Sequence, residues 1–291
     1  MKQYSLIELE TYQAVVEAGS FNLAADRLST SAATVSRRIS TLESALGVRL
    51  LNRTTRNINL TEAGEQYLDD VKNILESVEI SEERIGEGKA EAKGELRIAA
   101  PLSFGIKHLS PLLPSFMKSH PNIIINLKLE DSQTDLQAEG IDIALRVTQN
   151  IKDSSLIATP LCSIPIVICA SPDYINKHGK PKSINDIQKY NFLGYSLASN
   201  NLKTRLGSNS DPRIGFVANN GDVIREAAIN GFGITALPLF LIEDDLKNGK
   251  LVTIIDNQVK PETLYAVRLS RRFTPTKVKV MVDYLRDTFK D

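Results

Sequence analysis

Apolar residues in the first sixty positions recur at the spacing of one helical face. The clearest case is "SAATVSRRISTLESALG", residues 31–47, in which an apolar stripe alternates with small and charged residues. The residues of this stripe are Val35, Ile39, Leu42 and Leu46. Two shorter helices are predicted before it, the first ending at Gly19 and the second following Ser20. Helix, tight turn and helix, with Ser31 as the cap of the last one, is the pattern of a helix-turn-helix.

A wing and a long helix are predicted next. Residues 48–60 lack a helical period, which favours a short hairpin. A long helix then begins within Thr61–Glu65, and its apolar residues alternate by three and four. The predicted seam consists of Leu68, Val71, Leu75 and Val78. This spacing predicts a coiled coil through which two copies of the chain dimerise. The alternative is an amphipathic helix that packs against its own domain.

Strands and helices alternate from Glu95 onwards, which predicts an α/β domain with parallel strands covered by helices. The predicted strands "ELRIAAP", "IIINLKLED" and "IDIALRV" are separated by the predicted helices "SFGIKHLSPLLPSFMKSHP" and "QTDLQAEG". A second lobe follows Thr159, and the late strand "ETLYAVRL" returns to the first lobe with the final helix. Crossovers that could act as hinges are expected at "TPLCS", residues 159–163, and "KPETL", residues 260–264.

These patterns divide the chain into three parts, and the fold class is α plus α/β. The parts are a winged helix-turn-helix in 1–61, a linker helix for dimerisation in 62–92, and a two-lobed α/β domain in 93–291. The lobes are lobe I in 93–160 and 265–291 and lobe II in 161–264. Each lobe is long enough to enclose a small core, so a cleft between them is expected.

Charge is distributed unevenly although its sum is zero. The chain has 35 basic and 35 acidic residues among its 291. Six arginines lie between Arg27 and Leu60 against one acid, Glu43, whereas the segment 61–92 carries ten acids and three bases. A basic block followed by an acidic helix indicates that the N-terminal part meets phosphate and that the helix after it does not.

The outer face of residues 31–47 supplies the candidates for reading DNA. A helix that enters the major groove needs a narrow N-terminal half, and small and hydroxylated residues provide it here. Arg37 points away from the core stripe and is the candidate for guanine recognition, whereas Arg38 on its flank is placed for phosphate. The alternative is a solvated helix with exposed arginines. Arginines of the wing are candidates for phosphate or minor-groove contacts. The predicted DNA-binding residues are Ser31, Ala32, Ala33, Thr34, Ser36, Arg37, Arg38, Arg53 and Arg56.

The array "FNLAADRLSTSAATVSRRISTLESALGVRLLNRTTRNINLTEAG" resembles the DNA-binding region of LysR-type transcriptional regulators. The later motifs "AAPLSFG", "GIDIALRV", "SPDYINKHGKP" and "NGFGITALP" are similar to that family's two-lobed, periplasmic-binding-protein-like effector domain. The resemblance covers essentially the whole chain. It implies a homodimer or homotetramer that binds a partly palindromic site on double-stranded DNA and senses a small molecule. Ala32 and Ala33 depart from the pattern, because many relatives carry Gln near this position.

A cleft between the two lobes is the expected site for this small molecule. Ser103 follows the first strand, where it can cap a helix and where backbone amides favour an anion. Arg146 ends the predicted strand "IDIALR", so a small carboxylate or a similar polar metabolite is the expected effector. The predicted effector-binding residues are Leu102, Ser103, Arg146, Asn219 and Asn220. The alternatives are ordinary helix capping by Ser103, a structural ion pair of Arg146 with Asp142 or Asp131, and a turn at the two asparagines.

Other classes of function have little support in the sequence. The histidines lie apart, and neither a Walker loop nor a dinucleotide-binding motif is found, so no metal or cofactor is expected. An enzyme built on the two-lobed domain and a constitutive DNA-binding repressor without ligand are the alternatives to an effector-controlled regulator. No run approaches the ~18 apolar residues of a membrane span, and no signal peptide is recognised, so a cytoplasmic location without membrane contact is expected.

Two cysteines, Cys162 and Cys169, lie seven positions apart. In one straight strand such residues face opposite sides, which disfavours a disulfide between them. We therefore predict two buried thiols that behave as small apolar side chains, with a redox switch as the alternative.

Overall fold

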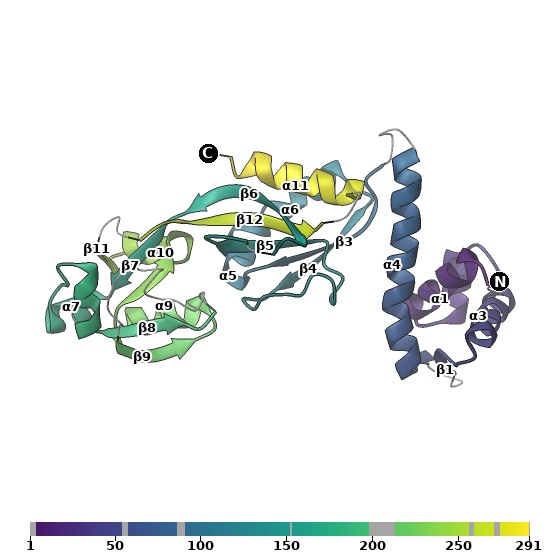
Figure 1. Ribbon diagram of the computed structural model, residues 1–291, viewed down its shortest axis with the longest axis horizontal. Coiled ribbons are helices and arrows are strands. Elements are labelled where there is room, and N and C mark those ends of the chain that lie inside the picture. Colours follow the sequence, from purple (N-terminus) through teal and green to yellow (C-terminus); the bar gives the residue numbers. More distant parts are fainter. Residues whose placement is uncertain are drawn as a thin grey trace. The chain divides into compact units, whose positions relative to one another are not determined.

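The computed structural model describes residues 4–53, 58–85, 91–151, 153–197, 213–255, 259–270 and 274–290. The chain divides into two units, Met1–Ala90 and Glu91–Asp291. Figure 1 shows a helical first unit and a second unit of mixed helix and sheet. Of the predicted DNA-binding residues, Arg56 lies outside the described residues, and the Arg53 side chain is not described. Among the described residues, no helix is both long and apolar enough to cross a membrane.

The first unit is a winged helix-turn-helix. Its elements are α1 (Leu6–Ala18), α2 (Phe21–Arg27), α3 (Ala32–Leu46), β1 (Leu51–Arg53), β2 (Ile58–Leu60) and α4 (Glu62–Ile85). α1 ends at Gly19 and α3 at Gly47, with φ of 63° and 73°, a left-handed conformation that favours glycine. Ser31 caps α3 and accepts a hydrogen bond from the Thr34 N–H at 3.1 Å, whereas Ser20 precedes α2 without a side-chain capping bond. β1 and β2 pair antiparallel, so the predicted hairpin is confirmed.

The core of the first unit lies where the apolar pattern placed it. Val35, Ile39 and Leu42 have no exposed surface, and Leu46 packs at the edge of the same cluster. The Tyr12 hydroxyl on α1 donates a hydrogen bond to the Gly64 carbonyl at 2.8 Å, which fixes the first turns of α4 against α1. The predicted apolar stripe of α3 is therefore confirmed.

The long helix α4 corrects the predicted dimer seam. Val71 has no exposed surface and belongs to the core of the helix-turn-helix, and Leu68 and Leu75 pack against that core. A side chain enclosed by its own domain has no surface left for a second chain, so the placement of Val71 in an intermolecular seam is wrong. The alternative, an amphipathic helix packed on its own domain, describes this stripe. Ile74 is 40% exposed, so the apolar surface that α4 offers lies on another face.

Lobe I of the second unit is a five-stranded sheet covered by helices. Its elements are β3 (Gly94–Ala100), β4 (Ile123–Leu129), β5 (Ile143–Thr148), β6 (Leu156–Ile164), β12 (Glu262–Leu269), α5 (Leu102–Phe104), the π-helical turn η1 (Gly105–Leu109), α6 (Leu113–Ser119) and α11 (Thr276–Thr288). The strand order is β4-β3-β5-β12-β6, in which β3 runs parallel to β4 and β5, and β12 antiparallel to β5 and β6. The predicted return of the last strand is confirmed. α11 packs against α6, where Tyr284 donates to the Leu112 carbonyl at 3.0 Å (Figure 1).

Two helix predictions in lobe I were wrong. The segment 103–121 was expected to form one helix, but the helical run of α5 and η1 ends at Leu109 and α6 begins at Leu113, because Pro111 has no N–H to continue the ladder and Pro114 is tolerated only in the first turn of a helix. The segment "QTDLQAEG" forms turns rather than a helix. There the Asp135 carboxylate accepts from the backbone N–H groups of Gln137 and Ala138, the kind of local bond that competes with helix formation.

Lobe II is built around a central strand with a second, smaller sheet beside it. Its elements are β7 (Ile166–Ala170), β8 (Asn191–Tyr195), β9 (Arg213–Ala218), β10 (Thr235–Pro238), β11 (Val252–Ile255), α7 (Pro172–His178), the 3₁₀ helix η2 (Ile184–Lys189), α9 (Gly221–Ile229) and α10 (Leu239–Lys247). β7 lies between β10 and β11, and β8 pairs in parallel with β9. α9 starts directly after β9, with Asn220 as its cap.

The first crossover between the lobes lies slightly beyond its predicted place, whereas the second ends before most of the predicted segment 260–264, because β12 already begins at Glu262. "TPLCS" was expected to be a hinge, but residues 159–163 lie inside β6 and pair with β12. β6 ends at Ile164, and the chain enters β7 after Pro165. Cys169 is buried on β7, but Cys162 on β6 is partly exposed, so the prediction of two buried thiols is wrong for Cys162; no disulfide joins the two. Burial, together with the nearby Asp245 carboxylate, raises the pKa of the Cys169 thiol to about 12, so this thiol stays protonated.

Candidate DNA-reading face and interlobe cavity

The outer face of α3 is a stripe of small and hydroxylated side chains around one arginine. We call this stripe the reading face. Its exposed residues are Ser31, Ala33, Arg37, Ser40, Thr41 and Ser44. Ser40 and Thr41 donate to the carbonyls of Ser36 and Arg37 at 3.0 and 3.1 Å, so these hydroxyls lie flat on their own helix. Arg37 is therefore the long side chain of this face, and it extends into solvent.

The other predicted residues of α3 are partly committed to the domain itself. Ala32, Thr34 and Ser36 are half-buried, and the Thr34 hydroxyl lies 2.8 Å from the Ser31 hydroxyl within the cap. Arg38 is also half-buried, and its Nη1 donates to the Thr11 hydroxyl on α1 at 3.4 Å. The Arg38 guanidinium therefore joins α3 to α1, and it lies on the flank of the reading helix.

Glu43 has a role that the sequence analysis missed. It is the one acid of α3, and its Oε1 accepts hydrogen bonds from the backbone N–H groups of Leu50 and Leu51 at 2.9 and 3.1 Å. These bonds fix the start of β1, and therefore the wing, to the C-terminal end of α3. The charge of Glu43 is thereby directed at the protein backbone rather than at the reading face. Its position three residues before the end of α3 is the sequence signal that could have indicated a contact with the following wing.

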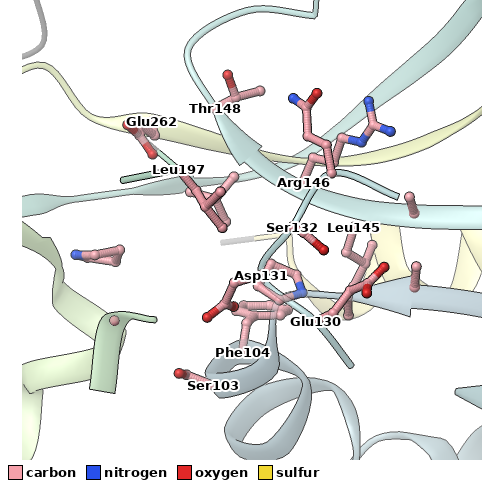
Figure 2. Close-up of a pocket in the computed structure, with 18 of the residues that line it drawn as sticks. Ser103, Phe104, Glu130, Asp131, Ser132, Leu145, Arg146, Thr148, Leu197 and Glu262 are labelled. Atoms are coloured by element: carbon pink, nitrogen blue, oxygen red, sulfur yellow. The ribbon is translucent and has the colours of Figure 1, made fainter. Parts of the chain in front are cut away.

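A cavity of about 550 Å³ separates the two lobes of the second unit, and we call it the interlobe cavity. Lobe I contributes the ends of β3, β4 and β5 together with α5, and lobe II contributes the segment from Ala236 to Leu241 with Tyr195, Leu197 and Gly221. Figure 2 shows Ser103, Phe104, Asp131 and Arg146 around it. This is the expected position for a ligand site in an open α/β fold, beyond the carboxyl ends of parallel strands.

Ser103 lies in this cavity but does not cap a helix. The capping position of α5 is Pro101, and Ser103 is buried inside the helix. Its hydroxyl donates a short hydrogen bond to the carboxylate of Asp222 on α9, which belongs to the other lobe. The capping prediction was therefore wrong, and the side chain instead joins the two lobes.

Asp131 makes a second connection between the lobes. It follows β4, and its carboxylate accepts from the backbone N–H of Leu102 at 3.0 Å and from the Asn220 side-chain amide at 2.8 Å. Asn220 in turn caps α9, with its Oδ1 accepting from the backbone N–H groups of Asp222 and Val223. The amide at the start of α5, which was expected to bind an anionic effector, thus already faces a carboxylate of the protein.

Arg146 lines the cavity from β5, and its Nη2 donates to the Thr134 carbonyl at 2.9 Å. Burial lowers the pKa of this guanidinium, and the opposite charge of Asp153 counteracts that shift, so Arg146 stays charged. The alternative partner Asp142 instead lies 3.6 Å from Lys277. Of the predicted effector-binding residues, Ser103 and Arg146 line the cavity, whereas Leu102, Asn219 and Asn220 are not among its lining residues.

Two family descriptions match the chain. "Bacterial regulatory helix-turn-helix protein, lysR family" matches residues 6–65, and "LysR substrate binding domain" matches residues 89–290. The chain belongs to the LysR family. It is similar to the HTH-type transcriptional regulator CrgA of Neisseria meningitidis serogroup C, with 33% identity over 284 residues that cover 96% of this chain and 95% of that protein. It is also similar to the HTH-type transcriptional regulator DmlR of Escherichia coli K12, with 30% identity over 292 residues that cover 98% of this chain and 95% of that protein. The solved structure of CrgA from Neisseria meningitidis aligns with a TM-score of 0.60 and 31% identity, covering 98% of this chain and 99% of that one.

This LysR-type regulator therefore has the predicted fold class, a winged helix-turn-helix with a long helix and a two-lobed substrate-binding domain. Both named relatives are described as HTH-type transcriptional regulators. No group of His, Cys, Asp and Glu side chains within the described residues could hold a metal ion.

The sequence analysis missed the carboxylates that organise the cavity. Asp131 was considered only as a possible ion-pair partner of Arg146, and Asp222 was given no role. Each follows directly after a strand or within the first turn of a helix, which is where ligand sites of α/β domains gather their polar groups. That positional signal was present in "LED" and in "NNGD".

Proposed function

We propose that this LysR-type regulator reads double-stranded DNA with α3 in the major groove and Arg37 directed at a guanine. The observation that supports this most is an exposed arginine on a stripe of small side chains, on a helix that is capped at Ser31 and seated on a closed core. A guanidinium can donate two parallel hydrogen bonds to the O6 and N7 atoms of guanine. Small neighbours allow the helix to approach the bases closely.

We propose that the wing arginines Arg53 and Arg56 contact phosphate, a role that rests on the sequence pattern alone.

Self-association is proposed to use the outer face of α4. A groove there is lined by Tyr4, Tyr67, Asp70, Asn73, Ile74, Ser77, Val78, Ser81 and Glu82. Ile74 and Val78 lie four residues apart on this face, and they replace Val71 and Leu75 as candidates for the dimer contact. A dimer, alone or within a tetramer, would place two reading faces on half-sites about 34–36 Å apart.

We propose that a small molecule in the interlobe cavity modulates DNA binding. The volume of the cavity is that of a metabolite-sized site, and hydrogen bonds of both lobes meet at its wall. A ligand that prefers one arrangement of the lobes shifts the population towards that arrangement by its differential affinity. We do not propose a carboxylate as this small molecule, because the Leu102 N–H and the Ser103 hydroxyl are already bonded to the carboxylates of Asp131 and Asp222. A regulator of transcription works where the DNA is, so we also propose a cytoplasmic location for the protein.

The DNA-reading proposal is tested with the purified full-length protein and a randomised DNA library. Replacing Arg37 by Ala is expected to cost about 1–3 kcal/mol on the selected site and to relax base preference at one position. The matched control is Arg286→Ala, which removes an exposed arginine from α11 and is expected to bind like the unchanged protein. Full affinity and unchanged base preference in Arg37→Ala would show that another surface reads DNA.

The effector proposal is separated from a constitutive repressor by a thermal-shift screen of metabolites. A ligand that binds the folded state raises the apparent stability by mass action, and the hit is then added to a DNA-binding titration. A stabilising metabolite that changes DNA affinity supports the effector role. A hit that leaves DNA affinity unchanged, or the lack of any hit, favours the constitutive repressor, whereas turnover of a metabolite would revive the enzyme alternative.

A further inference from the structure

The interlobe cavity is acidic where its residues are described. Its lining includes the carboxylates of Glu130, Asp131, Asp153 and Glu262 and the one described cation Arg146. Glu130 lies 2.9 Å from Lys128, and Asp153 faces the charge of Arg146, so these two carboxylates are partly neutralised. Asp131 differs from them, because both of its hydrogen-bond partners, the Leu102 N–H and the Asn220 amide, are uncharged.

Asp222 is the counterpart of Asp131 on the other lobe, and it reaches the cavity through Ser103, which lines the cavity whereas Asp222 itself does not. It accepts its side-chain hydrogen bond from the uncharged Ser103 hydroxyl, and Arg225 lies close enough to interact with its charge. Arg225 itself is bonded to the buried Asp245, with its Nη2 donating at 3.0 Å. The boundary between the lobes thus carries one carboxylate from each side, Asp131 and Asp222, each bonded to a neutral donor of the opposite lobe.

These two carboxylates occupy the donors that an anionic ligand would need. The Leu102 N–H and the Ser103 hydroxyl point at the negative oxygens of the protein. A carboxylate ligand would have to displace Asp131 or Asp222 and then remain beside it, with two like charges in a partly desolvated space. A ligand that brings hydrogen-bond donors and positive charge would replace only the Asn220 amide or the Ser103 hydroxyl.

Aromatic rings form part of the same wall. Phe104 and Phe240 both line the cavity and meet edge to face, with ring centroids 5.4 Å apart, and Tyr195 lines it from β8. Figure 2 shows Phe104 beside Asp131 and Ser103. Carboxylates next to aromatic faces are a combination that binds organic ammonium ions, since the ring face attracts the cation and the carboxylate accepts its N–H groups.

We propose that the interlobe cavity selects an organic ammonium ion with an apolar body, that Asp131 in the cavity wall anchors its positive charge, and that Asp222 behind Ser103 adds a second carboxylate from the other lobe. This inference rests on the proposed effector function and gives the class of its ligand. The ammonium group replaces the neutral donors that now join the lobes, so that binding exchanges the Ser103–Asp222 and Asn220–Asp131 contacts for contacts to the ligand. The apolar body lies against Phe240 and Tyr195, since the Phe104 ring is buried and stacked on His108.

The test compares probes that have the same shape and different charge. Isothermal titration of the full-length protein near pH 7 uses 2-phenylethylamine, phenylacetate and the uncharged 2-phenylethanol. The amine is expected to bind at least about tenfold more tightly than phenylacetate, a difference of about 1.4 kcal/mol. Asp131→Asn and Asp222→Asn, which keep the side-chain shape, are each expected to remove most of this preference. Asp244→Asn removes an exposed carboxylate from α10 and is expected to keep it.

The other outcomes overturn the assignment. Tighter binding of phenylacetate, binding of neither charged probe at millimolar concentration, or a preference that persists in both aspartate variants would each contradict an ammonium site anchored at Asp131 and Asp222. A DNA-binding titration on the same preparations separates this failure from failure of the proposed function. Protein that binds DNA specifically and responds to phenylacetate refutes the ligand class while supporting effector control.

Discussion

The reading face and the interlobe cavity differ in what their polar groups already bond to. On α3 the Arg37 side chain extends into solvent, and the hydroxyls of Ser40 and Thr41 donate to carbonyls of their own helix. In the cavity, Ser103 and Asp131 bond to partners on the opposite lobe. The reading face can meet DNA as it stands, whereas the polar groups of the cavity are already hydrogen-bonded to one another across the two lobes.

This difference assigns different energetic roles to the two surfaces. DNA can meet the reading face without breaking protein hydrogen bonds, so its affinity depends on new contacts and on charge. A ligand in the cavity must exchange existing bonds, and leaving a buried partner unpaired costs about 1–3 kcal/mol. Binding there is therefore coupled to the arrangement of the lobes, which is the property that a sensor requires.

The largest expected effect concerns the core under the reading face. Val71→Asp places a charge in an apolar cluster without a partner and is expected to cost about 3 kcal/mol or more in unfolding free energy. Ile74→Asp, on the exposed side of the same helix, is expected to keep the fold and weaken self-association. Circular dichroism melting and sedimentation measure both properties. A Val71→Asp protein that melts like the unchanged one would mean that the reading face does not depend on this core.

The next effect concerns charge at the wing. Arg53→Ala is expected to weaken binding to all DNA sequences about equally and to reduce the slope of log K against log salt by about 1. Phosphate carries no base identity, so the base preference should not change. Binding is measured over a series of salt concentrations, with Arg37→Ala as the contrasting variant. A changed base preference in Arg53→Ala would assign it to the reading surface instead.

A smaller effect is expected from the bond that joins the lobes. Ser103→Ala removes the donor to Asp222 and is expected to lower the free energy of unfolding by about 1–2 kcal/mol. Combined with Asp222→Asn in a double-mutant cycle, the two changes should be clearly non-additive, because they remove the same contact. Ser110→Ala, whose hydroxyl bonds to its own helix, is the matched control. Additive effects would indicate that the two side chains act independently.

The smallest effect concerns His108, which stacks on Phe104 and meets Phe240 of the opposite lobe edge to face. Its Nε2 is buried without a hydrogen-bond partner among the described residues. Burial lowers the pKa of His108 below its usual 6.5, Lys107 lowers it further, and Glu243 opposes the shift. The unfolded chain therefore binds more protons below about pH 6.5, so stability falls as the pH falls through this range.

We expect His108→Phe to reduce the loss of melting temperature between pH 7.5 and 5.5 by about 1–2 °C. His178→Phe, at an exposed position, should leave that loss unchanged. Differential scanning fluorimetry at matched ionic strength measures both variants. An unchanged pH dependence in His108→Phe would show that this imidazole does not link protonation to the contact between lobes.

Local signals explain why the helix-turn-helix was predictable. Ser31 and Gly47 mark the ends of α3 by side-chain and backbone preferences that operate within a few residues. The apolar stripe between them has only one way to be buried. The long helix was different, since a spacing of three and four residues serves equally for packing on another chain and for packing on α1. The bond from Tyr12 to Gly64, across 52 positions, decided between them.

Distance along the chain explains what the sequence did not reveal about the cavity. Ser103 and Arg146 were correctly placed at its wall, Ser103 just after β3 and Arg146 in the second half of β5. Their partners were not foreseeable from local pattern, since Ser103 and Asp222 are 119 positions apart and Asn220 and Asp131 are 89 apart. The expected anion followed from treating the start of α5 as vacant, whereas a carboxylate of the same lobe already faces it.

The burial of Val71 also determines how this protein can be recombined with others. A gene fusion that takes only residues 1–61 would remove part of the cluster around Tyr12 and Ile39 and the carbonyl to which Tyr12 donates. The smallest portable DNA-binding segment therefore extends through the first half of α4, at least to Leu75. Exchange of sensor domains between such regulators is expected to succeed when the junction lies after that residue, and to yield insoluble chimeras when it lies before Val71.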